Sequence, residues 1–244
     1  AGTLTNVVAT AAGDLELASQ ESDRGLRFDG VDDYVNTNSP STLGLNNTIY
    51  KIEIRFKGTG NLGFGNVFGS TGRFIFVNPS DGRIGINGAG VTNWTNLYAS
   101  LTAFNVIVVQ PGIVTLNGVS QALSFGDMFD SLSAPIRIGT AYDTYNGLNY
   151  GGYFSGDIDY VKIWSGSTLK LFWELNETSG TKASDSSGNG KAGTLVNGPI
   201  WVAFNSYVTS GSRVSPIYDI GFVGIAASST ISWNATTPAG TSLT

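Results

Sequence analysis

The sequence predicts an all-β protein in which two antiparallel sheets pack face to face as a sandwich. Its composition is that of short strands joined by tight turns, with 33 glycines and only 13% charged residues among 244. No stretch has the periodicity of a long amphipathic helix. The 13 Phe, 10 Tyr and 5 Trp residues are enough to fill a sizeable core.

The first strong element is a hairpin over residues 26–35. Leu26 and Phe28 alternate with charged neighbours, as in a strand with one buried face. Asp29-Gly30 is a turn dipeptide, and a second strand begins at Tyr34. The turn between the two strands therefore crowds three carboxylates together.

Residues 49–57 form the clearest half-buried strand, because their almost perfect alternation places Ile52, Ile54 and Phe56 on one face. Further strands are predicted at residues 74–77, 83–86, 106–109, 113–116 and 135–139. Pro111-Gly112 and Asn117-Gly118 are turns between or after such strands. The total is roughly a dozen strands, the number expected for two packed sheets of this size.

The run Phe-Asp-Gly-Val-Asp-Asp-Tyr-Val from Phe28 to Val35 resembles the signature of laminin-G-like domains, which belong to the concanavalin A-like lectin/glucanase superfamily. Residues 153–164 resemble the last core strand of those domains, and residues 172–198 resemble the stretch that normally opens one. The resemblance extends over residues 23–202. It implies a concanavalin A-like antiparallel β-sandwich, or jelly roll.

The opening stretch stands after the closing strand in this chain. Either the domain is circularly permuted or a second copy begins and is cut short; we favour permutation, because no second Phe-Asp-Gly turn follows Trp201. Permutation predicts that residues 169–175 and 193–202 supply strands of the same sandwich. Phe172, Leu195 and Trp201 are then expected in its core.

The two ends of the chain predict a small additional β unit. Residues 1–21 and 204–244 resemble parts of a β-module of phage tail and cell-surface proteins, with the sandwich of residues 22–203 inserted between them. The expected core of this split unit is Leu15, Leu17, Ile217 and Trp233. The alternative is that both ends are extra strands on the sandwich. The hairpin at the C-terminal end turns without returning, so the chain continues or another subunit completes the sheet, which makes a homo-oligomer possible.

The composition excludes several function classes. Without any Cys or His, the chain has no disulfides, no thiolate or imidazole metal ligands and no Ser-His-Asp or Cys-His machinery. The net charge of −5 argues against a nucleic-acid partner, and no apolar run is long enough for membrane insertion. Glycan-cleaving members of the superfamily carry a Glu-x-Asp-x-x-Glu strand, which is missing here. Glu174 and Glu177 remain as a minority candidate for a catalytic pair.

The acidic turn is the predicted metal site. Clustered carboxylates repel one another unless a positive charge is present, and a hard cation bound by oxygens is the usual solution. Strand parity directs Asp159 toward the core, where an ionised group needs a counter-charge. The resemblance implies a cation near these turns, so we expect Ca²⁺ held by Asp29, Asp32 and Asp159. The alternatives are a solvated turn at the aspartates and Arg27 as the partner of Asp159.

Two aromatic segments are the predicted ligand surface. Trp94 and Tyr98 lie in one of them, and Tyr142, Tyr145 and Tyr150 lie in the other, interleaved with amide side chains. Flat rings with polar tips suit stacking on sugars, but they suit protein contacts and loop packing as well.

The function predicted from the sequence is that of a non-enzymatic carbohydrate-binding or adhesion module of an extracellular, cell-surface or virion protein. Its partner is a surface glycan or another protein. A structural virion or assembly protein without a glycan ligand is the alternative, and a glycoside hydrolase is the least favoured interpretation.

Overall fold

A computed structural model describes residues 3–5, 7–9, 15–17, 23–63, 73–88, 91–129, 132–133, 135–140, 152–204 and 212–214 of the chain. The chain divides into two units, Ser19–Tyr207 and a smaller one made of Ala1–Ala18 with Val208–Thr244. No described residue is helical, and thus none belongs to a helix that could span a membrane.

The smaller unit contains two antiparallel strand pairs. β1 (Thr3–Thr5) pairs with β19 (Ser212–Val214), which joins the two ends of the chain, and β2 (Val7–Ala9) pairs with β3 (Leu15–Leu17). The side chains predicted to form its core, those of Leu15, Leu17, Ile217 and Trp233, lie outside what the structure describes.

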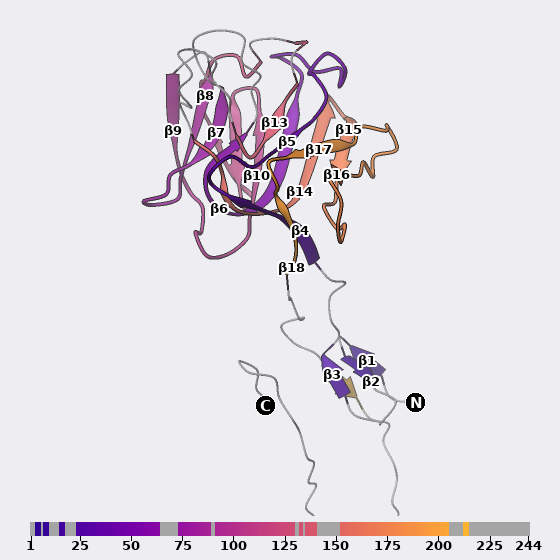
Figure 1. Cartoon of the computed structure of the whole chain (residues 1–244). Helices are drawn as coiled ribbons and strands as arrows, with labels where there is room; N and C mark the ends of the chain where they lie inside the picture. The colour runs from indigo at the N-terminus through magenta and orange to yellow at the C-terminus, as the bar shows by residue number, and fades with distance from the viewer. Residues whose placement is uncertain are drawn as a thin grey trace, which may run out of the picture. The chain divides into compact units, whose positions relative to one another are not determined.

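The larger unit is a sandwich whose two sheets share β6 (Lys51–Gly63) (Figure 1). The stretch of β6 from Lys51 to Thr59 pairs in the first sheet, and the stretch from Gly60 to Gly63 pairs in the second. Gly58, Gly60 and Gly63 have φ values of 144°, 97° and 99° at this crossing. Such φ values are open to glycine and strained for other residues, which is why the strand bends here.

The first sheet is built around β14 (Ser155–Ser165), which pairs with β6 along one edge. Its other edge pairs first with β4 (Asp23–Asp29) and then with β15 (Thr168–Trp173), and β18 (Ile200–Phe204) pairs with β4. Beyond β6 the sheet continues through β10 (Asn105–Gln110), β11 (Ile113–Leu116) and β12 (Val119–Ala122). Every pairing is antiparallel.

The second sheet begins with the meander β9 (Val91–Tyr98), β8 (Arg83–Gly88) and β7 (Phe74–Val77), which joins the end of β6. It continues through β13 (Arg137–Ile138), β5 (Tyr34–Asn36), β17 (Gly193–Val196) and β16 (Lys182–Ala183). These pairings are antiparallel as well. The all-β antiparallel sandwich predicted from the sequence is confirmed.

The core lies between the two sheets. In β6, Ile52, Ile54 and Phe56 are fully buried, while the residues between them are partly exposed, as the alternation predicted. Leu62 and Ile75 face them from the second sheet, and all five belong to one continuous apolar cluster. Burial of this cluster is the main source of stability, at about 1.5–3 kcal/mol for each large apolar side chain.

Four strands that come after β14 in the chain belong to the sandwich: β15 and β18 lie in the first sheet, and β16 and β17 lie in the second. The predicted burial of Phe172 was wrong, because Leu171 and Trp173 are the inward residues of β15 and are fully buried. Phe172 faces outward, with its ring centroid 6.4 Å from that of Tyr160. Leu195 and Trp201 are partly buried and pack against the core. The permuted order relative to laminin-G-like domains stays a prediction.

Candidate functional site

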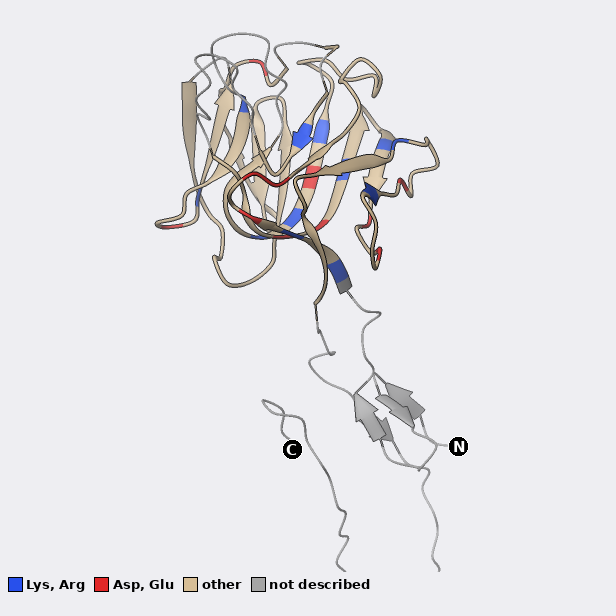
Figure 2. Cartoon of the chain, in the orientation of Figure 1, with Lys and Arg blue, Asp and Glu red and all other residues tan. Residues whose placement is uncertain are grey.

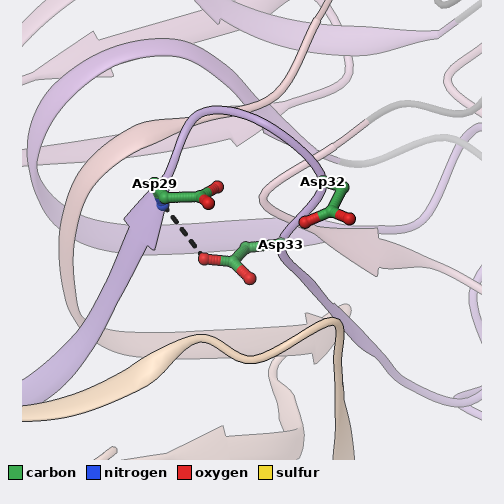
Figure 3. A group of neighbouring side chains, drawn as sticks. All are labelled: Asp29, Asp32 and Asp33. Atoms are coloured by element: carbon green, nitrogen blue, oxygen red, sulfur yellow. Dashed lines mark hydrogen bonds between the residues drawn. The ribbon is translucent and has the colours of Figure 1, made fainter.

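The turn between β4 and β5 brings three carboxylates together (Figure 3). Asp29 accepts a hydrogen bond from the backbone N–H of Val31 at 2.8 Å, and Gly30 between them takes a φ of 81°. Asp33 accepts a hydrogen bond from the backbone N–H of Asp29 at 3.0 Å. Oxygens of Asp29, Asp32 and Asp33 all lie within 4.8 Å of one another.

Asp33 is the buried member of this group, with only 3% of its surface exposed. Burial raises the pKa of Asp33, the charges of Asp29 and Asp32 raise it further, and the hydrogen bond from the Asp29 backbone opposes them. The site therefore favours a bound proton or a bound cation. The alternation of the strand predicts that the Asp33 side chain is buried. Asp33 lies two positions before the core residue Val35, so both side chains lie on the same face of the strand.

The spacing of the carboxylates fits a hard cation. Two oxygens that bind one Ca²⁺ at roughly 2.3–2.6 Å lie at most about 5 Å apart, which the three aspartates satisfy. The turn is also held from outside, since Asn197 donates its side-chain amide to the backbone carbonyl of Asp32 at 2.9 Å. Asp29, Asp32 and Asp33 are thus the residues that could hold a metal here.

The structure does not bring Asp159 to this turn. Asp29 pairs in register with Ser155 at the start of β14, and Asp159 lies four residues further along that strand. It is the extra residue of a β-bulge between Ile158 and Tyr160, and its carboxylate pairs with Arg55. The bulge, which the sequence pattern does not reveal, redirects the side chain.

Arg27, the alternative partner for Asp159, binds Asp157 instead. Its Nε lies 2.7 Å from one carboxylate oxygen, and Lys57 lies 3.3 Å from the other. These residues lie on the neighbouring strands β4, β6 and β14 of the first sheet, where Figure 2 shows positively and negatively charged positions side by side. Arg27, Arg55 and Lys57 are therefore already paired with the aspartates of β14.

A second candidate surface lies on the outward face of the second sheet, at β7, β8 and β9. The ring of Trp94 extends across Gly85, where an added Cβ would be only 3.0 Å from a ring carbon. Phe76 supports it edge to face, with the two centroids 6.0 Å apart. Trp94 remains 38% exposed and Tyr98 55% exposed. Phe76, Arg83, Gly85, Trp94 and Tyr98 together form what we term the β9 platform.

A β-bulge shapes the platform. Arg83 pairs with Tyr98 and Gly85 with Trp94, so a two-residue step in β8 faces a four-residue step in β9. The bulge is filled by the buried Thr95, whose hydroxyl donates to the carbonyl of Ile84 at 2.9 Å and accepts from the N–H of Leu97 at 3.0 Å. Bulges commonly re-aim side chains next to functional sites. Here the bulge sets Trp94 and Tyr98 close together on one face.

Arg83 is the platform residue that sequence reasoning missed. Its Nε donates to the carbonyl of Thr95 at 2.6 Å and one Nη2 hydrogen to Asn96 at 3.4 Å. The guanidinium carbon lies 5.8 Å from the centre of the Trp94 ring. No sequence signal marked this arginine, because only the bulged pairing of β8 with β9 brings it to Trp94.

The other predicted ligand residues, Tyr142, Tyr145 and Tyr150, lie outside the described residues. Their segment is flanked by Thr140 and Tyr153, which form a bridge, and the N–H of Phe154 donates to the carbonyl of Gly139 at 2.8 Å. Gly139 also lies close to the Asp33 carbonyl. The described flanks of this segment therefore lie beside the acidic turn.

Glu174 and Glu177, the candidate catalytic pair, have separate partners. Glu174 is exposed and accepts from the side-chain amide of Asn176 at 2.9 Å. The Glu177 carboxylate accepts a hydrogen bond from the backbone N–H of Ser184 and so holds the loop between them. Neither arrangement presents two carboxylates across a substrate.

No protein-family model and no curated protein matches the sequence significantly. Solved structures do match. A provisionally named carbohydrate-binding protein from Bacteroides ovatus aligns with a TM-score of 0.55 at 16% identity, over 78% of this chain and 62% of its own. This match is one of fold: both chains are antiparallel β-sandwiches.

Two further matches are more distant. A heptameric SAP-like pentraxin from Limulus polyphemus has a TM-score of 0.42 at 14% identity and covers 77% of this chain and 94% of its own. The LG4-5 domains of the mouse laminin alpha1 chain have a TM-score of 0.43 at 17% identity and cover 69% of this chain and 46% of their own. This chain thus spans less than two thirds of the length of the Bacteroides and laminin chains that it matches.

Proposed function

We propose that this chain is a non-enzymatic carbohydrate-binding or adhesion module that binds a surface glycan at an extracellular or virion surface. The observation that carries the proposal is the half-exposed ring of Trp94, laid across Gly85 and supported from the side by Phe76. One face of a sugar ring is apolar, so it stacks on such a surface, while neighbouring polar groups bond its hydroxyls. Asn96, exposed beside Arg83, supplies such a polar group.

The provisional name of the Bacteroides protein is consistent with this function. Rigidity is a second support. Trp94 needs little ordering when a ligand arrives, because Phe76 and the Thr95-filled bulge already hold its strand. A surface ordered before binding loses less entropy on association.

We further propose that the acidic turn binds Ca²⁺ through Asp29, Asp32 and Asp33. The ion would neutralise the mutual repulsion of these carboxylates and hold the β4–β5 turn in one conformation. Asp33 replaces Asp159 in this ligand set, because the bulge in β14 directs Asp159 elsewhere. Tyr142, Tyr145 and Tyr150 stay in the proposal as further ligand contacts, on the strength of the sequence alone.

A purely structural role, as a virion or assembly protein, is the second candidate. It is favoured by apolar side chains that protrude beside the platform, with Val91 and Val119 both 62% exposed on β9 and β12. Exposed apolar and aromatic groups of this kind also mark protein interfaces. Self-association in solution without any glycan binding would favour this role.

A glycan array separates the two roles. We expect the wild-type chain to bind at least one class of saccharide saturably, and Trp94→Ala to lose that binding. Trp164→Ala is the matched control, because Trp164 is also partly exposed but stacks with Lys51 on the opposite sheet. Binding that survives Trp94→Ala, or an array without any signal, would remove the β9 platform as a glycan site.

A further inference from the structure

We infer that Arg83 makes the β9 platform selective for acidic sugars, by pairing with the carboxylate of a uronic or sialic acid residue stacked on Trp94. The inference rests on the proposed function and names the class of glycan. The guanidinium carbon lies 5.8 Å from the centre of the Trp94 ring, and Arg83 is opposite Tyr98 in register. A sugar stacked on Trp94 would bring its substituents within reach of Arg83.

The unused hydrogen-bonding capacity of Arg83 points to an anionic ligand. A guanidinium has five N–H donors, and Arg83 gives two of them to the protein, one to Thr95 and one to Asn96. No described residue accepts from the other three donors, which include both on Nη1. A planar guanidinium edge matches a carboxylate with two parallel hydrogen bonds, which makes this pairing stronger and more directional than a bond to a hydroxyl.

The charged surroundings of Arg83 differ from those of Arg27 and Arg55 on the first sheet. Arg27 and Arg55 each pair with an aspartate, whereas no carboxylate among the described residues pairs with the Arg83 guanidinium. The nearby acidic group is Asp81, which is exposed in the turn before β8 and accepts the backbone N–H of Arg83 at 2.9 Å. The one local positive charge of the platform is therefore not neutralised by an ion pair within the described part of the chain.

The net charge of the chain cannot explain a preference for acidic sugars. At −5, the protein as a whole does not attract an acidic glycan. Preference for a carboxylate must then come from a specific contact. The bond from Nε to Thr95 holds the guanidinium in place before a ligand arrives, which lowers the entropic cost of that contact.

A paired glycan array tests the inference directly. Each uronic-acid or sialic-acid oligosaccharide is printed beside its neutral, carboxyl-reduced counterpart, and the strongest pair is then titrated by calorimetry. We expect the acidic form to bind about tenfold or more tightly than the neutral form, as a charge-assisted hydrogen bond predicts.

The variants assign that preference to Arg83. Arg83→Met should bring the two forms to equal affinity, and Arg83→Lys should restore only part of the preference, since it keeps the charge without the planar edge. Arg137→Met is the matched control, because Arg137 also stacks on an aromatic ring, that of Tyr34, elsewhere on the second sheet. Thermal melts of each variant show whether it folds.

Three results would overturn the inference. Equal binding of acidic and neutral forms by the wild-type chain contradicts selectivity while leaving the glycan-binding function intact. A loss of both affinities in folded Arg83→Met shows that Arg83 only clamps the bulge. Binding of neither form by the wild-type chain removes the proposed function together with the inference.

Discussion

The ring of Trp94 occupies the space that a side chain at position 85 would fill, so Gly85 is what allows the ring to lie flat on the second sheet. A Cβ there would be 3.0 Å from the ring, closer than ordinary van der Waals contact, and Gly85 has no positive φ that would itself demand glycine. The glycine is therefore explained by the tryptophan rather than by the backbone.

Gly85→Val should tilt or displace the Trp94 ring and weaken glycan binding about as much as Trp94→Ala does. The cost in stability should be about 1–3 kcal/mol, the usual penalty for overpacking. Tryptophan fluorescence and array binding measure the two effects. Ala203→Val, at an exposed position of β18, is the control. Unchanged binding by folded Gly85→Val would show that the flat ring is not needed.

Asp33→Asn should have opposite effects with and without calcium. Because the folded-state pKa of Asp33 is raised, the ionised carboxylate destabilises the fold above the unfolded pKa, and this cost is relieved as pH falls. In EDTA near neutral pH, Asp33→Asn should therefore melt at the wild-type temperature or higher, with the amide oxygen still accepting the Asp29 N–H.

Added Ca²⁺ should stabilise the wild-type chain by about 2.7 kcal/mol at 100 times its dissociation constant, and stabilise Asp33→Asn much less. Asp29→Asn should lose the same response, whereas Asp159→Asn should keep it, since Asp159 pairs with Arg55. Melting curves that are identical in EDTA and Ca²⁺ for the wild-type chain would remove the metal from the proposal.

Asp185 is expected to support the edge of β15 in a pH-dependent way. Its burial acts to raise the pKa, but backbone N–H groups of Phe172, Lys191 and Ser187 outweigh it and hold the pKa of Asp185 below the ordinary value. A depressed pKa gives stability that is present above the unfolded pKa and lost as pH falls through the folded one.

Asp185→Asn should consequently cost roughly 1–3 kcal/mol at pH 7, and its difference from wild type should shrink in acid. Urea denaturation at a series of pH values measures this. Glu174→Gln, at an exposed position nearby in sequence, is the control and should change little. A difference that stays constant down to the acid limit would contradict the role of the ionised carboxylate.

Neighbouring residues of β15 should respond very differently to truncation. Trp173→Ala should cost about 3–5 kcal/mol, because Trp173 is fully buried and also donates its indole N–H to Lys191. Phe172→Ala should cost clearly less, because that ring faces outward. Equal losses in denaturant midpoints would show that the inward and outward faces of β15 are wrongly assigned.

Where alternation is unbroken, the sequence was sufficient to predict the fold. The pattern of β6 placed Ile52, Ile54 and Phe56 in the core, and the turn after Phe28 was recognisable from Asp29-Gly30. Predicting the face of a strand residue from its odd or even position failed where the strand pairing is irregular. Asp159 lies in a bulge of β14. The extra residue of a bulge moves the side chains that follow it to the opposite face of the sheet, and the sequence of apolar and polar residues does not reveal it.

The site was predicted in part for the same reason. The exposed positions of Trp94 and Tyr98 were open to prediction from their aromatic, polar surroundings, but their proximity to Arg83 depends on the bulged pairing of β8 with β9. Asp33 was left out of the predicted ligand set although its parity with Val35 indicated a buried side chain. Its role comes from burial beside two other carboxylates, and a count of acidic residues in a turn does not distinguish the buried one.

The most direct test of the glycan-binding proposal is an NMR titration of the ¹⁵N-labelled chain with the saccharide selected on the array. The chain has five tryptophans, so each indole N–H signal can be assigned by single Trp→Phe variants. We expect the Trp94 indole and the backbone amides of residues 95–98 to shift saturably, while the buried Trp173 indole stays unchanged. Saturable shifts that gather elsewhere on the chain, with the Trp94 signal unmoved, would contradict the account.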